Sequence, residues 1–208
     1  LSELLKFETV SGADSGDGRE RFERETRRCL EFLESHARRL GMAFRNYDNR
    51  AAVAEMPGSD PKAPAVGVAL HIDVVPGGDG WTHPAFAGAV ADGAIWGRGA
   101  QDDKGPVAMA LAAVETLRAA GVAPVRSIRL LVGTREETGQ WDDVDLLIAK
   151  GEAPGPVLVP DGAFPIINGE KGMITVALEA GWKPPDSQTG RIRLVSLKSG
   201  RRANMVPD

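Results

Sequence analysis

The sequence has 208 residues, of which 42% are hydrophobic, enough for the core of one domain or of one domain with part of a second. A formal net charge of −4 without a long run of Lys and Arg argues against a nucleic-acid partner, and no apolar run is long enough to cross a membrane or resembles a signal peptide. The single cysteine excludes an intrachain disulfide and fits a reducing compartment, so a cytoplasmic location is expected.

The first predicted element is an amphipathic helix over residues 19–40, where apolar residues recur at steps of three or four. Gly41 ends it, as glycine often does just after a helix. Cys29 lies on the apolar stripe, so we interpret it as a small core residue and not as a nucleophile. Two short strands are predicted next, at 42–47 and 51–56, with a turn between them.

A continuous apolar run at 65–70 is typical of a strand buried on both faces, and His71 follows it at once. After a glycine-rich loop, residues 86–90 and 94–96 are predicted to form a hairpin.

The next elements alternate between helix and strand. A helix is predicted from Pro106, a residue suited to a first helical turn, to about residue 120. A strand at 127–132, a short helix at 144–150 and a strand at 157–159 follow. Strands separated by helices indicate a layered α/β core.

From residue 172 the pattern changes, because 173–178 and 191–197 alternate like half-exposed antiparallel strands. We therefore predict one domain over 1–171 and the beginning of a second over 172–208.

Residues with metal-binding side chains occupy similar positions around the predicted strands. Sites in open α/β sheets form at the carboxyl ends of the strands, and mixed histidine and carboxylate ligands suit zinc or another divalent ion better than calcium. Four candidates follow predicted strands, and a fifth precedes a helix within the glycine-rich segment G-R-G-A-Q-D-D-K-G: His71, Glu136, Glu137, Asp161 and Asp102.

Each candidate also has an ordinary structural interpretation. His71 could be a core histidine, although Asp73, two residues on, would point to the same side of an extended segment and could orient its ring. Glu136 and Glu137 could be a solvated loop pair, and Asp161 could begin a turn.

The glycines around Asp102 could instead cradle a phosphate, but neither G-x-x-x-x-G-K-[ST] nor a strand-linked G-x-G-x-x-G occurs. His83 is interpreted as a loop residue and not as a ligand.

Five motifs follow one another along the chain: H-I-D-V-V-P, G-R-G-A-Q-D-D-K-G, G-T-R-E-E-T, P-D-G-A-F-P and N-G-E-K-G. Taken together, these motifs resemble the co-catalytic zinc metallopeptidase family, which includes aminoacylases, acetylornithine deacetylase and carboxypeptidase G-type enzymes. The last two motifs and the closing N-M-V-P-D are most similar to the PepV-type dipeptidases.

This resemblance implies a three-layer catalytic domain, with a mixed sheet between helices, whose N-terminal part is residues 1–171. Residues 172–208 would begin an inserted α+β lid domain. Some family members pair through the lid, so the full-length protein could be a homodimer.

The resemblance also implies two zinc ions, which Co²⁺ or Mn²⁺ could replace. His71 and Asp161 would hold the first ion, Glu137 the second, and Asp102 would bridge both. The peptide bond between Asp102 and Asp103 is expected to be cis.

Three further roles follow from the resemblance. Glu136 would be the general acid and base, Asp73 would orient His71, and Asn204 of the lid would face the substrate. The implied reaction is hydrolysis of dipeptides of the Xaa-His or β-alanyl type through a metal-activated water. An N-acyl amino-acid deacylase with the same ligands, or a truncated metal-binding fragment without activity, are the alternatives.

One expected ligand has no counterpart in the sequence. In the family, a histidine for the second zinc comes from beyond the lid, and neither His36 nor His83 matches its motif. We therefore hypothesise that the chain is an N-terminal fragment whose second metal position lacks a ligand.

Overall fold

The computed structural model describes residues 1–12, 16–162, 166–169, 172 and 176. The chain divides into two compact units, Leu1–Ala163 and Phe164–Asp208. The strands predicted at 173–178 and 191–197 lie, apart from Val176, outside the described residues, so the lid domain over 172–208 stays a prediction.

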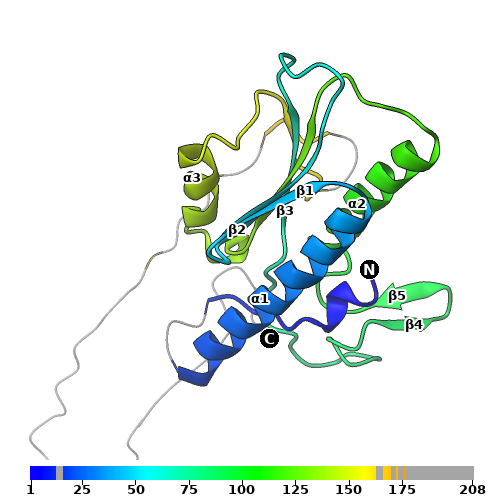
Figure 1. Cartoon of the computed structure of the whole chain (residues 1–208). Helices are drawn as coiled ribbons and strands as arrows, with labels where there is room; N and C mark the ends of the chain where they lie inside the picture. The colour runs from blue at the N-terminus through cyan, green and yellow to red at the C-terminus, as the bar shows by residue number, and fades with distance from the viewer. Residues whose placement is uncertain (13–15, 163–165, 170–171, 173–175, 177–208) are drawn as a thin grey trace, which may run out of the picture. The chain divides into compact units, whose positions relative to one another are not determined.

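Within the described residues, a five-stranded mixed sheet forms the centre of the first unit (Figure 1). In chain order the strands are β1 (Ala43–Tyr47), β2 (Ala51–Met56), β3 (Val66–His71), β6 (Ile128–Gly133) and β7 (Val157–Leu158), with a separate hairpin of β4 (Ala89–Ala91) and β5 (Ala94–Trp96). Across the sheet the order is β1-β2-β6-β3-β7. Strand β2 is antiparallel to both of its neighbours, whereas β3 is parallel to both β6 and β7.

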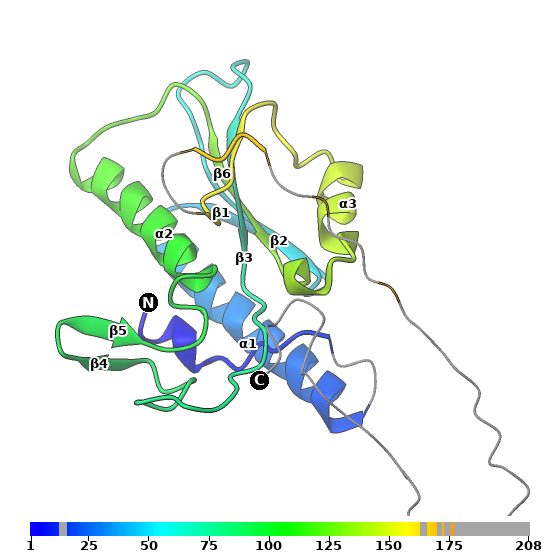
Figure 2. The same cartoon turned by 180° about the vertical axis from the view of Figure 1, so that it is seen from behind.

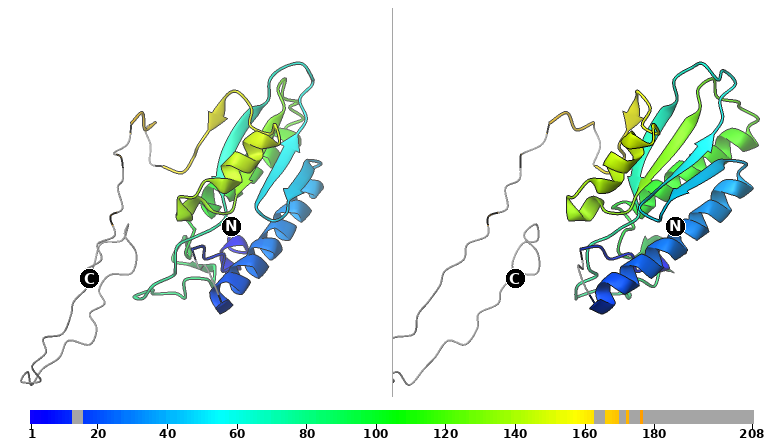
Figure 3. Two further views of the ribbon diagram at one scale, coloured as in Figure 1. Left: turned by 90° about the vertical axis from the view of Figure 1, so that its left-hand side faces the viewer. Right: turned by 60° about the vertical axis from the view of Figure 1, so that its left-hand side comes forward.

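Helices cover both faces of this sheet, as the views from behind and from the side show (Figure 2; Figure 3). Helices α1 (Gly16–Arg39) and α2 (Lys104–Ala119) pack on one face, and α3 (Asp142–Ala149) packs on the other. Two short 3-10 turns, η1 (Leu4–Lys6) and η2 (Glu136–Thr138), complete the elements. None of the helices in the described part of the chain is long and apolar enough to span a membrane.

Strand β2 illustrates how the sheet divides the core. Alternate side chains of a strand point to opposite faces. Ala52 and Ala54 therefore join the cluster formed with α1 and α2. Ala51 and Val53 face the other way and pack with Leu147 of α3. The prediction of an α/β fold with a mixed sheet between helices is confirmed.

Helix α1 buries its apolar stripe, as its periodicity predicts. Cys29 and Leu30 are both 0% exposed within the main cluster, so the core interpretation of Cys29 is confirmed. Burial raises the pKa of the Cys29 thiol to about 12, which leaves no reactive thiolate near neutral pH.

Three helices begin earlier than predicted, and the first of them, α1, begins at Gly16 and not at residue 19. Helix α2 begins at Lys104 and not at Pro106, because a proline within the first turn removes only an N–H that has no partner inside the helix. Helix α3 begins at Asp142 and not at residue 144, and the acids of its first turn complement the positive end of the helix dipole.

The first strand of the hairpin is shorter than predicted and begins at Ala89 instead of residue 86. The N–H of Ala87 donates to the carbonyl of Pro84 at 3.0 Å, and this turn replaces the expected start of the strand.

Candidate active site

The sheet brings three predicted site segments to one edge. Strands β3 and β6 are parallel, with His71 paired opposite Gly133, so the segments after both strands leave at the same edge. Glu136 and Glu137 lie in the segment after Gly133. Strand β7 lies on the other side of β3, and Asp161 follows it. Neighbouring parallel strands thus explain why residues far apart in the sequence meet here.

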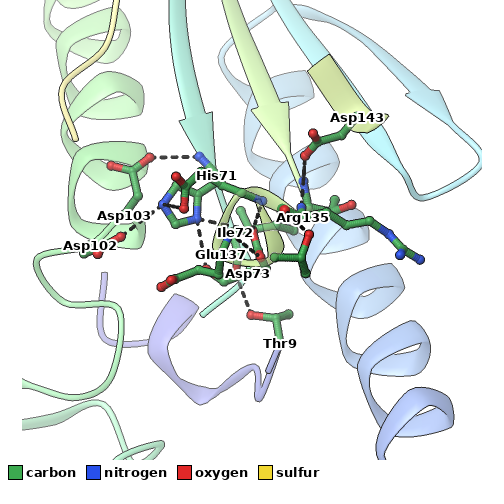
Figure 4. A network of polar contacts seen from close by, with 12 residues as sticks. Thr9, His71, Ile72, Asp73, Asp102, Asp103, Arg135, Glu137 and Asp143 are labelled. Atoms are coloured by element: carbon green, nitrogen blue, oxygen red, sulfur yellow. Dashed lines mark hydrogen bonds and ion pairs between the residues drawn. The ribbon is translucent and has the colours of Figure 1, made fainter. Parts of the chain in front are cut away.

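His71 is the centre of the site and is 3% exposed. Its backbone N–H donates to Asp103 Oδ2 at 2.8 Å (Figure 4). Its ring Nδ1 lies 3.0 Å from the carbonyl oxygen of Asp73 and 3.3 Å from Asp73 Oδ1. Two buried aspartates therefore fix His71: Asp103 holds its backbone N–H, and Asp73 holds the Nδ1 edge of its ring.

The other ring nitrogen faces carboxylates. His71 Nε2 lies 3.0 Å from Asp102 Oδ1, 3.4 Å from Asp161 Oδ2 and 3.9 Å from Glu136 Oε2. Asp102 Oδ1 is close enough to Nε2 for a hydrogen bond. Nε2 is nevertheless buried without a hydrogen-bond partner in the described part of the protein, so the two atoms are not aligned for one. A buried nitrogen that faces three acids has the surroundings of a metal ligand.

Asp73 has a second contact that the sequence does not reveal. Its carboxylate, 0% exposed, accepts the N–H of Glu136 and the N–H of Glu137, each at 3.1 Å. One carboxylate thus lies beside the imidazole and also holds the backbone of the glutamate pair.

The two adjacent aspartates of the glycine-rich segment have different places: one faces the site, and the other is buried and supports it. The peptide bond between Asp102 and Asp103 is cis, as the resemblance implies. The Asp102 side chain is 61% exposed and reaches His71, whereas Asp103 is fully buried beneath it. A Cβ on Gly105 would lie 2.1 Å from the carbonyl oxygen of Ala100, so this turn requires glycine. The scaffold role of Asp103 was not predicted from the sequence, where its position beside Asp102 is the only signal.

The acids of the site perturb one another. The contact with His71 holds the pKa of Asp102 below its ordinary value. Burial raises the pKa of Glu137 to about 7, with the negative charge of Asp102 as the next cause. Burial alone would lower the pKa of His71, but its contacts with Asp102, Asp161 and Asp73 raise it. So much negative charge around one imidazole favours a bound cation.

The donor set fits a divalent metal. His71, Glu136 and Asp161 offer ligand atoms that all lie within 4.8 Å of one another. Asp102 is nevertheless nearer to His71 Nε2 than Glu136 is, and its negative charge is the largest charge effect that raises the pKa of Glu137. The roles of Asp102 as shared ligand and of Glu136 as acid–base group stay predictions.

The metal-free protein is expected to lose stability between about pH 4 and pH 7. Burial raises the pKa of Asp103 and of Glu137 to about 7, from ordinary values of 3.8 and 4.5. The folded state therefore keeps protons that the unfolded chain has released, and the free energy of unfolding falls as the pH rises. The lowered pKa of Asp102 acts below this interval.

Thermal unfolding in EDTA and in excess Zn²⁺ at about pH 5 and about pH 7 checks this expectation. Because a metal needs deprotonated ligands, the stabilisation by Zn²⁺ should be larger at pH 7. In EDTA the melting temperature should be lower at about pH 7 than at about pH 5. An equal or higher melting temperature in EDTA at pH 7, or equal stabilisation by Zn²⁺ at both pH values, would contradict the expectation.

The two other histidines of the sequence lie outside this cluster. His83 lies in a loop, as predicted, with its ring against Trp96 at 5.3 Å between centroids. The ring of His36 contacts the carbonyl of Phe32 within α1. Asn204 lies outside the described residues.

Comparisons with known proteins give matches over much of the chain. Residues 67–193 match the model of peptidase family M20/M25/M40. YtjP of Bacillus subtilis, named as a candidate dipeptidase, is 34% identical over 206 residues, which cover 99% of this chain and 43% of that protein. SH1171 of Staphylococcus haemolyticus, also named as a candidate dipeptidase, is 35% identical over 208 residues, which cover 100% of this chain and 44% of that protein.

Among solved structures, human carnosine dipeptidase 1 is similar with a TM-score of 0.67 and 25% identity, over 78% of this chain and 38% of that one. The chain thus spans less than half the length of the curated relatives that it matches.

Proposed function

This chain belongs to peptidase family M20/M25/M40, and from that membership we propose that it carries most of the metal centre of a zinc-dependent dipeptidase. The observation that carries the proposal is the buried His71 ring, whose free Nε2 faces Asp102 and Asp161 at one edge of the sheet.

His71, Asp102 and Asp161 would hold a first Zn²⁺, while Asp102 and Glu137 would hold a second. When bound, such ions polarise the scissile carbonyl and lower the pKa of a coordinated water from about 15.7 to about 7. Co²⁺ and Mn²⁺ suit the same mixed donors.

Glu136 would move the protons of the reaction. Burial raises its pKa, with the neighbouring acids Asp161, Asp73 and Asp102 adding to the effect. A raised pKa makes a carboxylate a better proton acceptor, which suits proton transfer to a leaving amine. Asp73 would orient both the His71 ring and the backbone N–H of Glu136.

The substrate class rests on the relatives. Both curated relatives are named as candidate dipeptidases, and the similar solved structure is a carnosine dipeptidase. These names support small dipeptides as substrates. The finer assignment to Xaa-His or β-alanyl dipeptides, the contact of Asn204 with substrate and a homodimer formed through residues 172–208 are further parts of the proposal.

Hydrolysis assays with β-alanyl-histidine, plain dipeptides and N-acetyl amino acids, each with and without added Zn²⁺, test the proposal. Zinc-dependent release of amino acids from dipeptides is expected. Turnover of N-acetyl amino acids alone would favour the deacylase, which shares the ligand set. Binding of zinc without any turnover would favour the non-catalytic metal-binding alternative.

The isolated chain is expected to hold at most about one divalent ion tightly. The first position has His71, Asp102 and Asp161, and catalytic zinc sites normally use three protein ligands. The second has only Asp102 and Glu137 among the described residues. Calorimetric titration of the metal-free chain with Zn²⁺ measures this number. Two tightly held ions would contradict the prediction.

A further inference from the structure

We infer that Asp143, on α3 and outside the candidate ligand set, is a positioning residue for the segment that carries Glu136 and Glu137. The inference rests on the proposed function, because the glutamate pair is assigned there to acid–base chemistry and to metal binding.

The four consecutive backbone N–H groups from Thr134 to Glu137 all donate hydrogen bonds to the carboxylates of two buried aspartates. Asp143 Oδ2 accepts the N–H of Thr134 at 2.8 Å and that of Arg135 at 2.9 Å. Asp73 accepts the next two, from Glu136 and Glu137. Figure 4 shows Asp143 at one end of this segment and Asp73 at the other. The segment is therefore held at both ends by carboxylates.

Asp143 is itself fixed in place. It is 1% exposed, and its Oδ1 accepts the N–H of Val144 at 2.8 Å. Leu147, further along α3, packs into the cluster on this face of the sheet and anchors the helix. Asp143 is thus a buried carboxylate whose contacts come from backbone N–H groups, and such charge-assisted bonds are short and strong.

The end of β6 is shaped to admit this carboxylate. A Cβ on Gly133 would lie only 2.6 Å from Asp143 Oδ2. No side chain fits there while the carboxylate keeps its place, so Gly133 permits the close approach.

Asp143 has no contact with His71 in the described structure, which separates it from the ligands. Its effect on the site passes through the backbone. Asp73 contacts both the His71 ring and the last two backbone N–H groups of the segment. Asp143 accepts the first two N–H groups. Without Asp143 the glutamate carboxylates would lose a defined position relative to His71.

Asp143→Asn in the full, metal-loaded chain tests the inference. The amide retains one oxygen but loses the charge and presents an N–H group where the carboxylate accepts one. Loss of a partner that orients metal-site groups typically costs about 10- to 100-fold in activity, so a drop in kcat of this size is expected, with KM changed by less than about threefold. Hydrogen exchange of the peptide covering residues 133–140 should also become faster.

Two control variants separate positioning from general stability. Asp145→Asn removes an exposed acid from the same helix and should change neither kcat nor exchange. Val114→Ala truncates a buried residue of α2 and lowers the melting temperature without touching the segment. Each variant is measured at the same temperature interval below its own melting temperature. If Asp143→Asn then has the same kcat and the same hydrogen exchange at 133–140 as Val114→Ala, the inference is overturned.

Gly133→Ala is the second variant if Asp143→Asn does not fold. It drives a Cβ against Asp143 Oδ2 while keeping the charge, and it should produce the same faster exchange and lower kcat. Unchanged exchange in Gly133→Ala would overturn the inference. If the wild-type chain hydrolyses none of the dipeptides, the proposed function fails, but the exchange measurements still decide the role of Asp143.

Discussion

Replacing Glu136 with glutamine is expected to lower kcat for the best dipeptide by about 100- to 10,000-fold, the range that a positioned acid–base group contributes. Bound metal should be retained, because Glu136 lies 3.9 Å from His71 Nε2, farther than Asp102 or Asp161. The backbone N–H of residue 136 can still donate to Asp73, so the segment should keep its position. Steady-state kinetics together with metal analysis of the purified variant measure both effects.

Glu137→Gln is the matched control, since it changes the neighbouring carboxylate in the same segment. Glu137 is assigned to the second ion, which the isolated chain is expected to hold only weakly, so its loss should lower the affinity for a second Zn²⁺ before it affects proton transfer. Loss of metal from Glu136→Gln, with unchanged affinity for both ions in Glu137→Gln, would show that the two roles are reversed.

Replacing Asp102 with asparagine is expected to have the largest effect on metal binding. Asp102 is the carboxylate nearest to His71 Nε2 among the described residues, and the proposed function assigns it to both metal positions. Changes to groups that only orient ligands cost about 10- to 100-fold in metal affinity. Loss of a shared ligand should exceed this, and activity should fall below detection.

Calorimetric titration with Zn²⁺ measures the affinity of the Asp102→Asn variant. Asp92→Asn is the control, because Asp92 is exposed in the turn of the β4–β5 hairpin and has a positive φ of 53° that asparagine tolerates. Zinc affinity in Asp102→Asn within threefold of wild type would contradict the assignment of a bridging ligand.

The local order of the elements could be predicted from the sequence. The apolar run before His71 indicates a strand buried on both faces, and β3 ends at this residue. Periodicity likewise predicts α1 and the burial of Cys29. These features depend on patterns within a few neighbouring residues, which local geometry translates directly into helix or strand.

The places of the acids after predicted strands indicated which of them gather at one edge of the sheet, and the resemblance added the cis bond after Asp102. It assigned Asp73 to the imidazole alone. Its contacts with the N–H groups of Glu136 and Glu137 span more than 60 residues and arise from the parallel pairing of β3 with β6. No local pattern encodes such a pairing.

Asp143 shows most clearly the difference between what the sequence predicts and what the tertiary structure decides. In the sequence it is one of three acids at the start of a helix, beside Asp142 and Asp145, where the helix dipole favours any of them. Which one is buried depends on the rotation of α3 against the sheet, which the packing of Leu147 determines. The sequence by itself thus determined the order of the elements, the family and the residue types of the candidate metal centre. Only the tertiary structure decided which aspartates hold its backbone, because burial of a particular carboxylate depends on side chains that meet across the sheet.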